Sequence, residues 1–246
     1  LSVLLIIRNG LIFSFISIDS FKIKSKSTIL YLFIFIYNYL IFKCYYKSIM
    51  IIFISPPFGN YFKKFKINTK KFKDKNEFIE FVPIRGSFTL QERDGLLTQI
   101  VKTLRYSFTY KGWVNKIGLR NKGIDYAIDK YKQGEYKDDI ISVAVMNPDE
   151  IPILLEKIPI DMNIELNISC PNVGKHISDV GVEKFINRYR RWCILKLSPK
   201  IEKSQIIDFY NKGFRQFHCS NTLPTEQGGV SGKVLKEYTE SNTKFI

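Results

Sequence analysis

The chain has 246 residues, 45% of them hydrophobic and 15% aromatic, and carries a formal net charge of +15. This composition excludes a disordered chain, and the length suffices for one α/β barrel or two small domains with a sizeable core. Four widely spaced cysteines without a CxxC pair, and only two histidines, indicate neither a disulfide framework nor a zinc site. The positive charge would suit a polyanionic partner, but Lys, Asn, Ile, Phe and Tyr are used heavily throughout, and we favour an ordinary Lys-rich surface.

Residues 1–49 differ in composition from the rest of the chain. They contain one glycine, no alanine, proline or glutamate, and a single acidic residue, Asp19. The apolar run 29–42 is shorter than the roughly 20 residues that a membrane span needs, and extending it to residue 54 would bury Lys43 and Lys47. We predict an atypical apolar and basic N-terminal extension over 1–49, either read-through sequence or a membrane anchor, and a second region over 50–246.

From Met50 onward, apolar strand-like runs alternate with segments of helical period. We predict six strands, centred on Phe53, Val82, Val143, Leu166, Leu195 and Phe217. Helices are predicted over 96–107, 122–132, 147–158, 182–192 and 203–213, and an extended turn over 112–119. Such alternation is typical of βαβ units and a parallel sheet. The fold class is therefore α/β, a TIM-barrel-like parallel βα repeat that is incomplete, with about six of the eight strands of a closed barrel.

The segment Asn167-Ile168-Ser169-Cys170-Pro171-Asn172 directly follows one of these strands. It cannot simply extend the sheet, because proline lacks a backbone N–H, and functional residues in parallel barrels lie at the carboxyl ends of strands. The amides of Asn167 and Asn172 suit the edge of a planar polar ring, and the thiol of Cys170 is a candidate base. A lone cysteine is more often a small buried hydrophobe, but this setting favours the catalytic interpretation.

Three further motifs follow strand ends in chain order. The segment 115–119 (NKIGL) combines an amide with a glycine that permits close backbone approach, although alone it indicates only a turn. Lys196 interrupts the apolar run CILKLSP, where a buried ammonium needs an anionic partner or a polar cavity. Ser220-Asn221-Thr222 precedes GGVSG at 228–232, which we predict to be a Gly-rich loop that approaches a ligand with backbone N–H groups.

The motifs GSFT, NKIGL, NISCPN, LKLSP, SNT and GGVSG occur in the order and rough spacing of the dihydroorotate dehydrogenase family, which residues 51–240 resemble. The resemblance implies an FMN-containing TIM barrel that oxidises dihydroorotate to orotate in pyrimidine biosynthesis. A base removes a proton from C5 while hydride passes from C6 to the flavin. The family's base position falls on Cys170, and a cysteine there is similar to the soluble class 1 members.

The resemblance also implies binding roles and no metal. Its substrate contacts fall on Asn115, Ile117, Gly118, Leu119, Asn167, Asn172, Asn221 and Thr222. Its FMN contacts fall on Ser87, Asn167, Lys196, Ser220 and Gly232. Two positions depart from the family: Asn60 or Tyr61 stands near its first-strand lysine, and Ala144 stands at its third-strand asparagine.

The family's last two strands, whose Gly-rich ends hold the FMN phosphate, have no counterpart before Ile246, so we expect a chain truncated at its C-terminus. Three functions are open: an FMN-dependent dihydroorotate dehydrogenase, a non-catalytic fragment or degenerate relative, and a flavin barrel like tRNA-dihydrouridine synthases. The motifs favour the first, with dihydroorotate and orotate as ligands, no nucleic-acid partner and a cytoplasmic location. A homodimer is left open, and membrane association would require residues 29–54 to act as an anchor.

Overall fold

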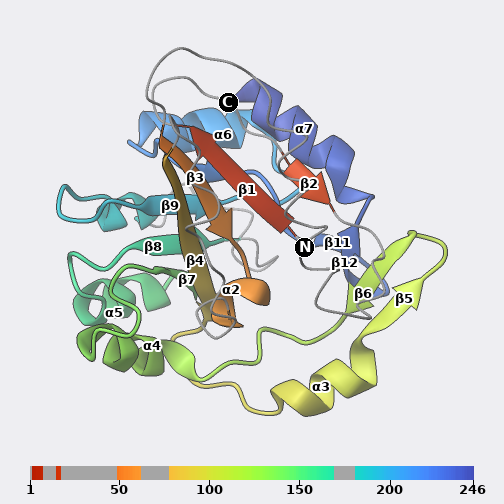
Figure 1. Cartoon of the computed structure of the whole chain (residues 1–246), viewed down its shortest axis with the longest axis horizontal. Coiled ribbons are helices and arrows are strands. Elements are labelled where there is room, and N and C mark those ends of the chain that lie inside the picture. The colour runs from red at the N-terminus through yellow and green to blue at the C-terminus, as the bar shows by residue number, and fades with distance from the viewer. Residues whose placement is uncertain (1, 8–14, 18–48, 62–77, 169–180) are drawn as a thin grey trace.

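The computed structural model describes residues 2–7, 15–17, 49–61, 78–168 and 181–246 (Figure 1). Six parallel strands lie side by side, in chain order, in one curved sheet. They are β3 (Ile49–Ile54), β4 (Phe78–Phe88), β7 (Ile140–Ala144), β8 (Ile164–Asn167), β9 (Cys193–Lys196) and β10 (Phe217–His218). The six predicted strands and their parallel order are confirmed, and they form a TIM-barrel-like half-barrel.

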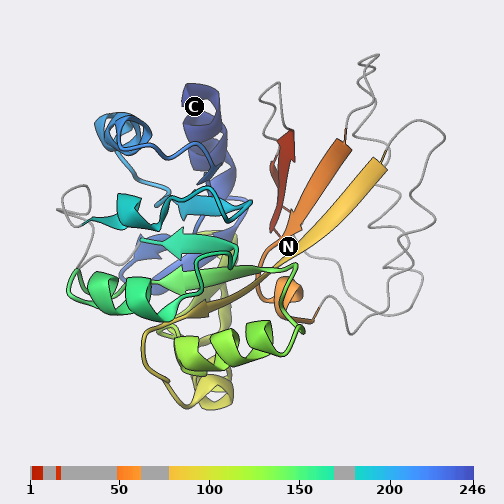
Figure 2. The ribbon, with the colours of Figure 1, turned by 90° about the vertical axis from the view of Figure 1, so that its left-hand side faces the viewer.

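Helices α4 (Gly123–Lys132), α5 (Glu150–Lys157) and α6 (Lys203–Asn211) lie between successive strands and cover one face of the sheet (Figure 2). Their apolar side chains pack against alternate strand residues in the main hydrophobic core, which includes Ile124, Leu154, Phe209, Val143, Leu166 and Leu195. Every residue of β7 and β8 is buried. Strands covered on both faces have to be apolar almost continuously, which explains why the sequence identified them readily.

The described part of residues 1–49 extends the sheet beyond β3. The strand β1 (Ser2–Ile7) pairs antiparallel with β3, and β2 (Phe15–Ser17) pairs antiparallel with β1, so the full order is β10-β9-β8-β7-β4-β3-β1-β2. The division of the chain at residue 50 stays a prediction, and the pairing of β1 with β3 crosses it. Among the helices of the described ranges, none has the length and apolar character of a membrane crossing. Most of the predicted anchor over 29–54 lies outside those ranges.

A second, antiparallel sheet has the order β11-β12-β6-β5. Its strands are β5 (Arg105–Ser107), β6 (Gly112–Asn115), β11 (Leu223–Thr225) and β12 (Gly228–Gly232). The prediction of a Gly-rich loop at 228–232 is therefore wrong. These residues form β12 because Val230 is fully buried against Val114, Leu223 and Leu235. The glycines let the strand approach closely, since a Cβ at Gly228 would clash with the carbonyl oxygen of Asn115.

Two predicted helices are shorter than expected. The helix predicted over 96–107 ends with α3 (Leu96–Thr103), because Leu104 is extended and the next residues form β5. Of the helix predicted over 182–192, only the 3₁₀ helix η4 (Val182–Phe185) forms. Asn187 explains the break, since its Oδ1 accepts the N–H groups of Tyr189 and Arg190 in a turn. The helices α2 (Phe58–Tyr61) and α7 (Leu235–Phe245) have no predicted counterpart.

Candidate functional site

The inner face of the sheet, opposite α4, α5 and α6, carries two layers of side chains. The apolar layer packs residues of four parallel strands with Trp192: Ile51, Phe53, Val82, Ile84, Ile140 and Ile194. The polar layer lies further toward the carboxyl ends of the strands and consists of Ser142, Glu165, Lys196 and His218. Strand side chains alternate between faces, and the neighbours of these four residues belong to the helix-facing core, so the polar layer points inward.

Glu165 of β8 is the centre of the polar layer and is fully buried. Its Oε1 accepts a hydrogen bond from Ser142 Oγ at 2.7 Å and lies 3.7 Å from Nζ of Lys196. Its Oε2 lies 2.6 Å from Nδ1 of His218. Of the two alternatives predicted for Lys196, an anionic partner or a polar cavity, the structure shows the first, and the partner is Glu165.

The surroundings of Glu165 keep its carboxyl group ionised. Burial by itself raises the pKa of Glu165, because it disfavours the charged form. The charges of Lys196 and His218, and hydrogen bonds from His218 and Ser142, outweigh burial and lower the pKa of Glu165 to about 2. Glu165 is thus a carboxylate at neutral pH and can only accept hydrogen bonds.

A chain of hydrogen bonds runs from Glu165 to the rim of the sheet. Ser142 Oγ and Ser87 Oγ of β4 are 2.8 Å apart. Asn167, at the end of β8, donates from Nδ2 to Ser87 Oγ at 3.2 Å. Asn221 donates from Nδ2 to Asn167 Oδ1 at 3.1 Å and accepts the N–H of the following residue at 2.9 Å. The structure thus brings together four residues to which binding roles were predicted: Ser87, Asn167, Lys196 and Asn221.

The backbone at Gly86 directs Ser87 toward this chain. The register between β4 and β7 shifts between Gly86 and Phe88, which marks a β-bulge, and bulges re-aim side chains. Gly86 has a φ of 109°, and a Cβ there would lie 2.7 Å from the carbonyl oxygen of Ser142. Asn60 of α2 supports the bulge, because its Oδ1 accepts the N–H of Gly86 at 2.9 Å. This position therefore requires glycine.

The antiparallel sheet places two more predicted contacts near each other. Asn115, at the end of β6, pairs with Gly229 of β12, and its Nδ2 donates to the carbonyl of Gly229 at 3.4 Å. On the other side of Gly229 lies Thr222, whose Oγ1 would be 2.9 Å from a Cβ added to that glycine. Because Thr222 follows Asn221, β12 connects the Asn115 segment to the hydrogen-bond chain.

The predicted substrate-facing residues 117–119 lie in the segment after β6. Gly118 is exposed, and Ile117 and Leu119 are half-buried. Asn121 ties this segment to the end of β4: its Nδ2 donates to the carbonyl of Leu119 at 2.6 Å, and its Oδ1 accepts the N–H of Thr89 at 3.1 Å. The segment is thus held at the carboxyl end of β4, and its role in binding stays a prediction.

The remaining predicted site residues lie elsewhere. Ser220 is buried directly before Asn221. Gly232 ends β12, where it pairs with Gly112 at the opposite end of β6 from Asn115. Cys170 and Asn172 lie outside the described residues, in the segment that follows β8.

The two described cysteines have thiols unsuited to proton abstraction at neutral pH. Burial raises the pKa of Cys193 to about 11 and the pKa of Cys219 to about 11. Both groups are therefore protonated and weakly reactive near pH 7. Neither competes with Cys170 for the predicted role of base.

Sequence reasoning did not single out Glu165, Ser142 or His218. A signal was present, because Glu165 interrupts the buried strand IELN much as Lys196 interrupts CILK on the neighbouring strand. In the parallel register Lys196 stands opposite Asn167, two residues from Glu165. Opposite charges that interrupt adjacent buried strands within two residues of each other would have indicated an internal ion pair.

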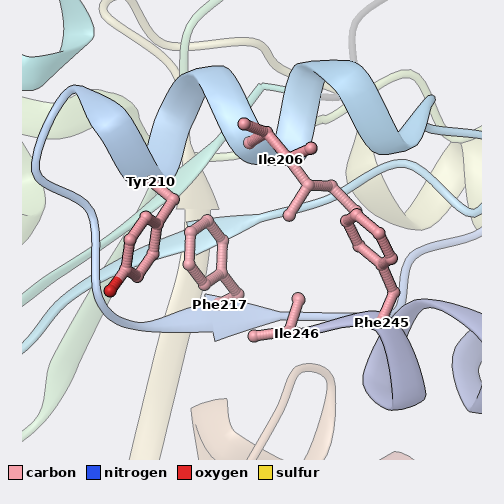
Figure 3. A pocket seen from close by; sticks show the side chains of 6 residues that line it. Ile206, Tyr210, Phe217, Phe245 and Ile246 are labelled. Carbon is pink, nitrogen blue, oxygen red and sulfur yellow. The ribbon is translucent and has the colours of Figure 1, made fainter.

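A separate apolar cavity of about 220 Å³ lies between α6, β10 and the end of α7 (Figure 3). Its lining consists of Ile206, Ile207, Tyr210, Phe217, Phe245 and Ile246. Ile206 and Phe217 belong to the helix-facing core, so the cavity is on the opposite side of the sheet from the polar layer. It offers one hydroxyl and no charged side chain, so its lining does not suit acid–base chemistry.

The donor set of the inner face suits a flavin ring better than a metal. In the described ranges, no group of His, Cys, Asp and Glu side chains could hold a metal ion. The amides of Asn167 and Asn221 offer both donors and acceptors to a heterocycle edge. The Lys196 side chain retains 13% exposure while that of Glu165 retains 0%, so the ammonium is the member of this pair that a ligand can reach. A cation there matches the negative charge that develops on a reduced flavin.

Comparison with known proteins identifies the family. The family model described as dihydroorotate dehydrogenase matches residues 62–213. A protein of Streptococcus agalactiae serotype Ia, named dihydroorotate dehydrogenase A (fumarate), is 32% identical over 138 residues, which are 48% of this chain and 44% of that protein. A Petrotoga mobilis protein, named dihydroorotate dehydrogenase B (NAD(+)), catalytic subunit, is 35% identical over 148 residues, 51% of this chain and 47% of that protein.

A longer match is to a Streptococcus pyogenes serotype M18 protein, also named dihydroorotate dehydrogenase A (fumarate), which is 30% identical over 203 residues. That match covers 69% of this chain and 63% of the relative, whereas the first two matches span about half of the relatives' length. No solved structure matches significantly. The family model covers more than half of the residues, and the chain therefore belongs to the dihydroorotate dehydrogenase family.

Proposed function

We propose that this chain carries the dihydroorotate-oxidising site of its family, with FMN as the cofactor and orotate as the product. The observation that carries the proposal is the polar layer, with its chain of hydrogen bonds from Glu165 through Ser142 to side chains at the carboxyl ends of β4, β8 and β10. Carboxyl strand ends are where parallel barrels hold their reacting groups. The names of the relatives point to the same substrate.

The residues of this chain divide the work between binding and proton transfer. FMN, when bound, supplies the acceptor for the hydride that leaves C6 of dihydroorotate. Lys196 offers positive charge next to the ring, and the amides of Asn167 and Asn221 orient a planar pyrimidine. Cys170 takes the proton from C5, so that substrate loses one proton and one hydride and gains the C5–C6 double bond.

The test is dihydroorotate-dependent reduction of flavin by the purified chain after incubation with FMN, followed by the loss of visible absorbance. Fumarate and NAD⁺ are both offered as acceptors, since the names of relatives include each. Cys170→Ala is expected to slow reduction by a factor on the order of 10²–10⁴, because it removes the general base. Cys170→Ser should retain part of the rate, most visibly at high pH, because a hydroxyl loses its proton only at higher pH than a thiol and so is less often in the basic form.

The matched control is Cys193→Ala, which removes a half-buried thiol whose Sγ contacts the carbonyl of Phe185. This variant should keep the rate of the unmodified chain. Near-normal reduction in Cys170→Ala would remove Cys170 from the mechanism. Failure of the unmodified, FMN-treated chain to oxidise dihydroorotate would contradict the proposed function itself.

A further inference from the structure

We infer that Glu165 is a positioning residue that fixes the donor and acceptor directions of the rim, and so decides which edges the amides of Asn167 and Asn221 present to a ligand. The inference rests on the proposed function only in treating the rim as the ligand site. Glu165 itself is buried beneath the rim and acts through Ser142 and Ser87.

The first step is the contact between Glu165 and Ser142. An ionised carboxylate has no hydrogen to donate, so the 2.7 Å contact with Ser142 Oγ requires the serine to donate. A hydroxyl has one hydrogen, and Ser142 uses it here. In the 2.8 Å contact between the two serines, Ser142 must therefore accept and Ser87 must donate.

The same counting continues to the rim. Ser87 has used its single hydrogen on Ser142, so the side chain that faces its remaining lone pairs has to be a donor. Asn167 can satisfy this requirement only with its NH₂ group, which lies 3.2 Å from Ser87 Oγ. Its carbonyl Oδ1 is thereby turned toward Asn221, whose Nδ2 donates to it at 3.1 Å.

The outer end of the chain has the matching direction. Asn221 Oδ1 accepts the backbone N–H of Thr222 at 2.9 Å, so its NH₂ group is the one directed at Asn167. The backbone N–H of Thr222 at one end and the carboxylate of Glu165 at the other thus impose the same donor-to-acceptor direction on the four side chains between them. Without the carboxylate, Ser142 and Ser87 can each reverse, and only the 3.1 Å contact with Asn221 then orients the amide of Asn167.

The second oxygen of Glu165 extends this role to His218. Because the carboxylate only accepts, the 2.6 Å contact of Oε2 requires a hydrogen on Nδ1 of His218. The Lys196 ammonium, 3.7 Å from Oε1, is drawn toward the same carboxylate from the partly exposed side. One buried side chain therefore orients an amide pair, an imidazole and a cation, through contacts that involve β7, β9 and β10.

The test compares the Glu165→Gln variant with the unmodified chain by ¹⁵N NMR. Glutamine has nearly the same shape but can donate as well as accept, so Ser142 no longer has to be the donor in this contact. The side-chain amide signals of Asn167, assigned by their absence in Asn167→Asp, should change from one set to two sets or to broadened signals. The ¹⁵N shift of Nδ1 of His218 should move toward that of a ring nitrogen without a hydrogen, because a glutamine can donate to Nδ1 where the carboxylate could only accept.

Asn242→Ala is the control, because Asn242 is also a buried polar side chain, and its Nδ2 donates to the carbonyl of Pro199 at 3.4 Å, outside the chain of hydrogen bonds. It should lower stability and leave the Asn167 and His218 signals in one set. If both variants perturbed these signals equally, or if Glu165→Gln left them unchanged, the inference would be overturned.

A second variant covers the case in which Glu165→Gln does not fold. Ser142→Ala interrupts the chain between Glu165 and Ser87 without changing any charge. It should alter the Asn167 amide signals while leaving the His218 pattern intact, since the contact at Oε2 remains. Unchanged Asn167 signals in this variant would contradict the inference on their own.

Ligand binding gives the functional measurement. Orotate affinity of the FMN-treated chain should fall on the order of tenfold in both Glu165→Gln and Ser142→Ala, because an amide edge that faces the ligand is no longer fixed. If the unmodified chain did not bind orotate, the proposed function would fail, and the NMR signals would still decide the role of Glu165.

Discussion

The apolar and polar layers of the inner face meet on two strands, β7 and β9, where their residues are two positions apart. In β7 the step leads from Ile140 to Ser142, and in β9 from Ile194 to Lys196. The strands pair in parallel through both layers, so backbone hydrogen bonding does not explain the change from apolar to polar side chains. A polar interior costs free energy unless each group is satisfied, whereas an apolar one stabilises by burial alone. The contrast shows where the sheet serves stability and where it carries groups for chemistry.

The two layers also differ in how their parts depend on one another. Side chains of the apolar layer each contribute through contact and can be exchanged for others of similar volume at modest cost. Members of the polar layer satisfy one another, and removing one leaves another buried without its partner. We therefore expect changes in the apolar layer to act on stability alone, and changes in the polar layer to act on stability, binding and pH dependence together.

The largest effect on stability is expected in the apolar layer. Phe53 is fully buried and packs edge-on against Trp192, with ring centroids 4.9 Å apart. Phe53→Ala should lower the free energy of unfolding by about 3–5 kcal/mol, because it removes buried area and leaves a cavity. Denaturant unfolding measures the loss.

Phe108 provides the control, because its side chain is 86% exposed. Phe108→Ala should change the free energy of unfolding by less than about 0.5 kcal/mol. Equal losses in the two variants would mean that the inner face is not a packed core.

A smaller effect on stability is expected at Gly86, where the β-bulge directs Ser87 toward the polar layer. Gly86→Ala should cost about 3 kcal/mol, because it combines a positive φ with a Cβ 2.7 Å from the carbonyl oxygen of Ser142. It should also weaken FMN binding, since Ser87 has to move. Gly95→Ala is the matched control: Gly95 has a φ of 88°, but its Cβ would meet nothing within 4 Å.

Gly95→Ala should therefore cost only about 1–2 kcal/mol, the strain of the left-handed backbone alone. Unfolding curves of both variants, and a titration with FMN, separate the two contributions. If Gly86→Ala lost no more stability than Gly95→Ala and bound FMN like the unmodified chain, the bulge would not be what directs Ser87.

The parts of this fold that could be predicted from the sequence are those in which a single local pattern, such as an apolar run, determines the structure. The parallel strands are short apolar runs buried on both faces. Lys196 in such a run indicated an anionic partner or a polar cavity, and the structure supplies the partner in Glu165. By contrast, β12 is four-fifths Gly and Ser with one buried valine, and its strand conformation depends on pairing with β6, far away in sequence. The helix predicted over 182–192 failed because the side chain of Asn187 competes for backbone N–H groups.

The candidate site divides in the same way. Asn167 and Asn221 stand out because they follow strand ends, and their hydrogen bond to each other joins them. Glu165, Ser142 and His218 resemble ordinary strand residues until the register of β7, β8, β9 and β10 places them in one layer. Tertiary pairing, rather than local pattern, creates that layer.

The smallest effect separates the layers by their response to acid. The pKa of Glu165 is lowered to about 2 in the folded chain from an ordinary value of 4.5, so the folded state holds its proton less tightly than the unfolded state. Its ionisation thus contributes stability that is fully present above about pH 4.5 and is lost as the pH falls toward 2. One such group changes the free energy of unfolding by at most about 1.4 kcal/mol per pH unit in that window.

Glu165→Gln should flatten the curve of unfolding free energy against pH there by up to this slope, whereas Phe53→Ala should lower the whole curve without changing its shape. Denaturant unfolding at several pH values measures both, and parallel curves for Glu165→Gln and the unmodified chain between pH 4.5 and pH 2 would show that the buried carboxyl is not held ionised by its neighbours.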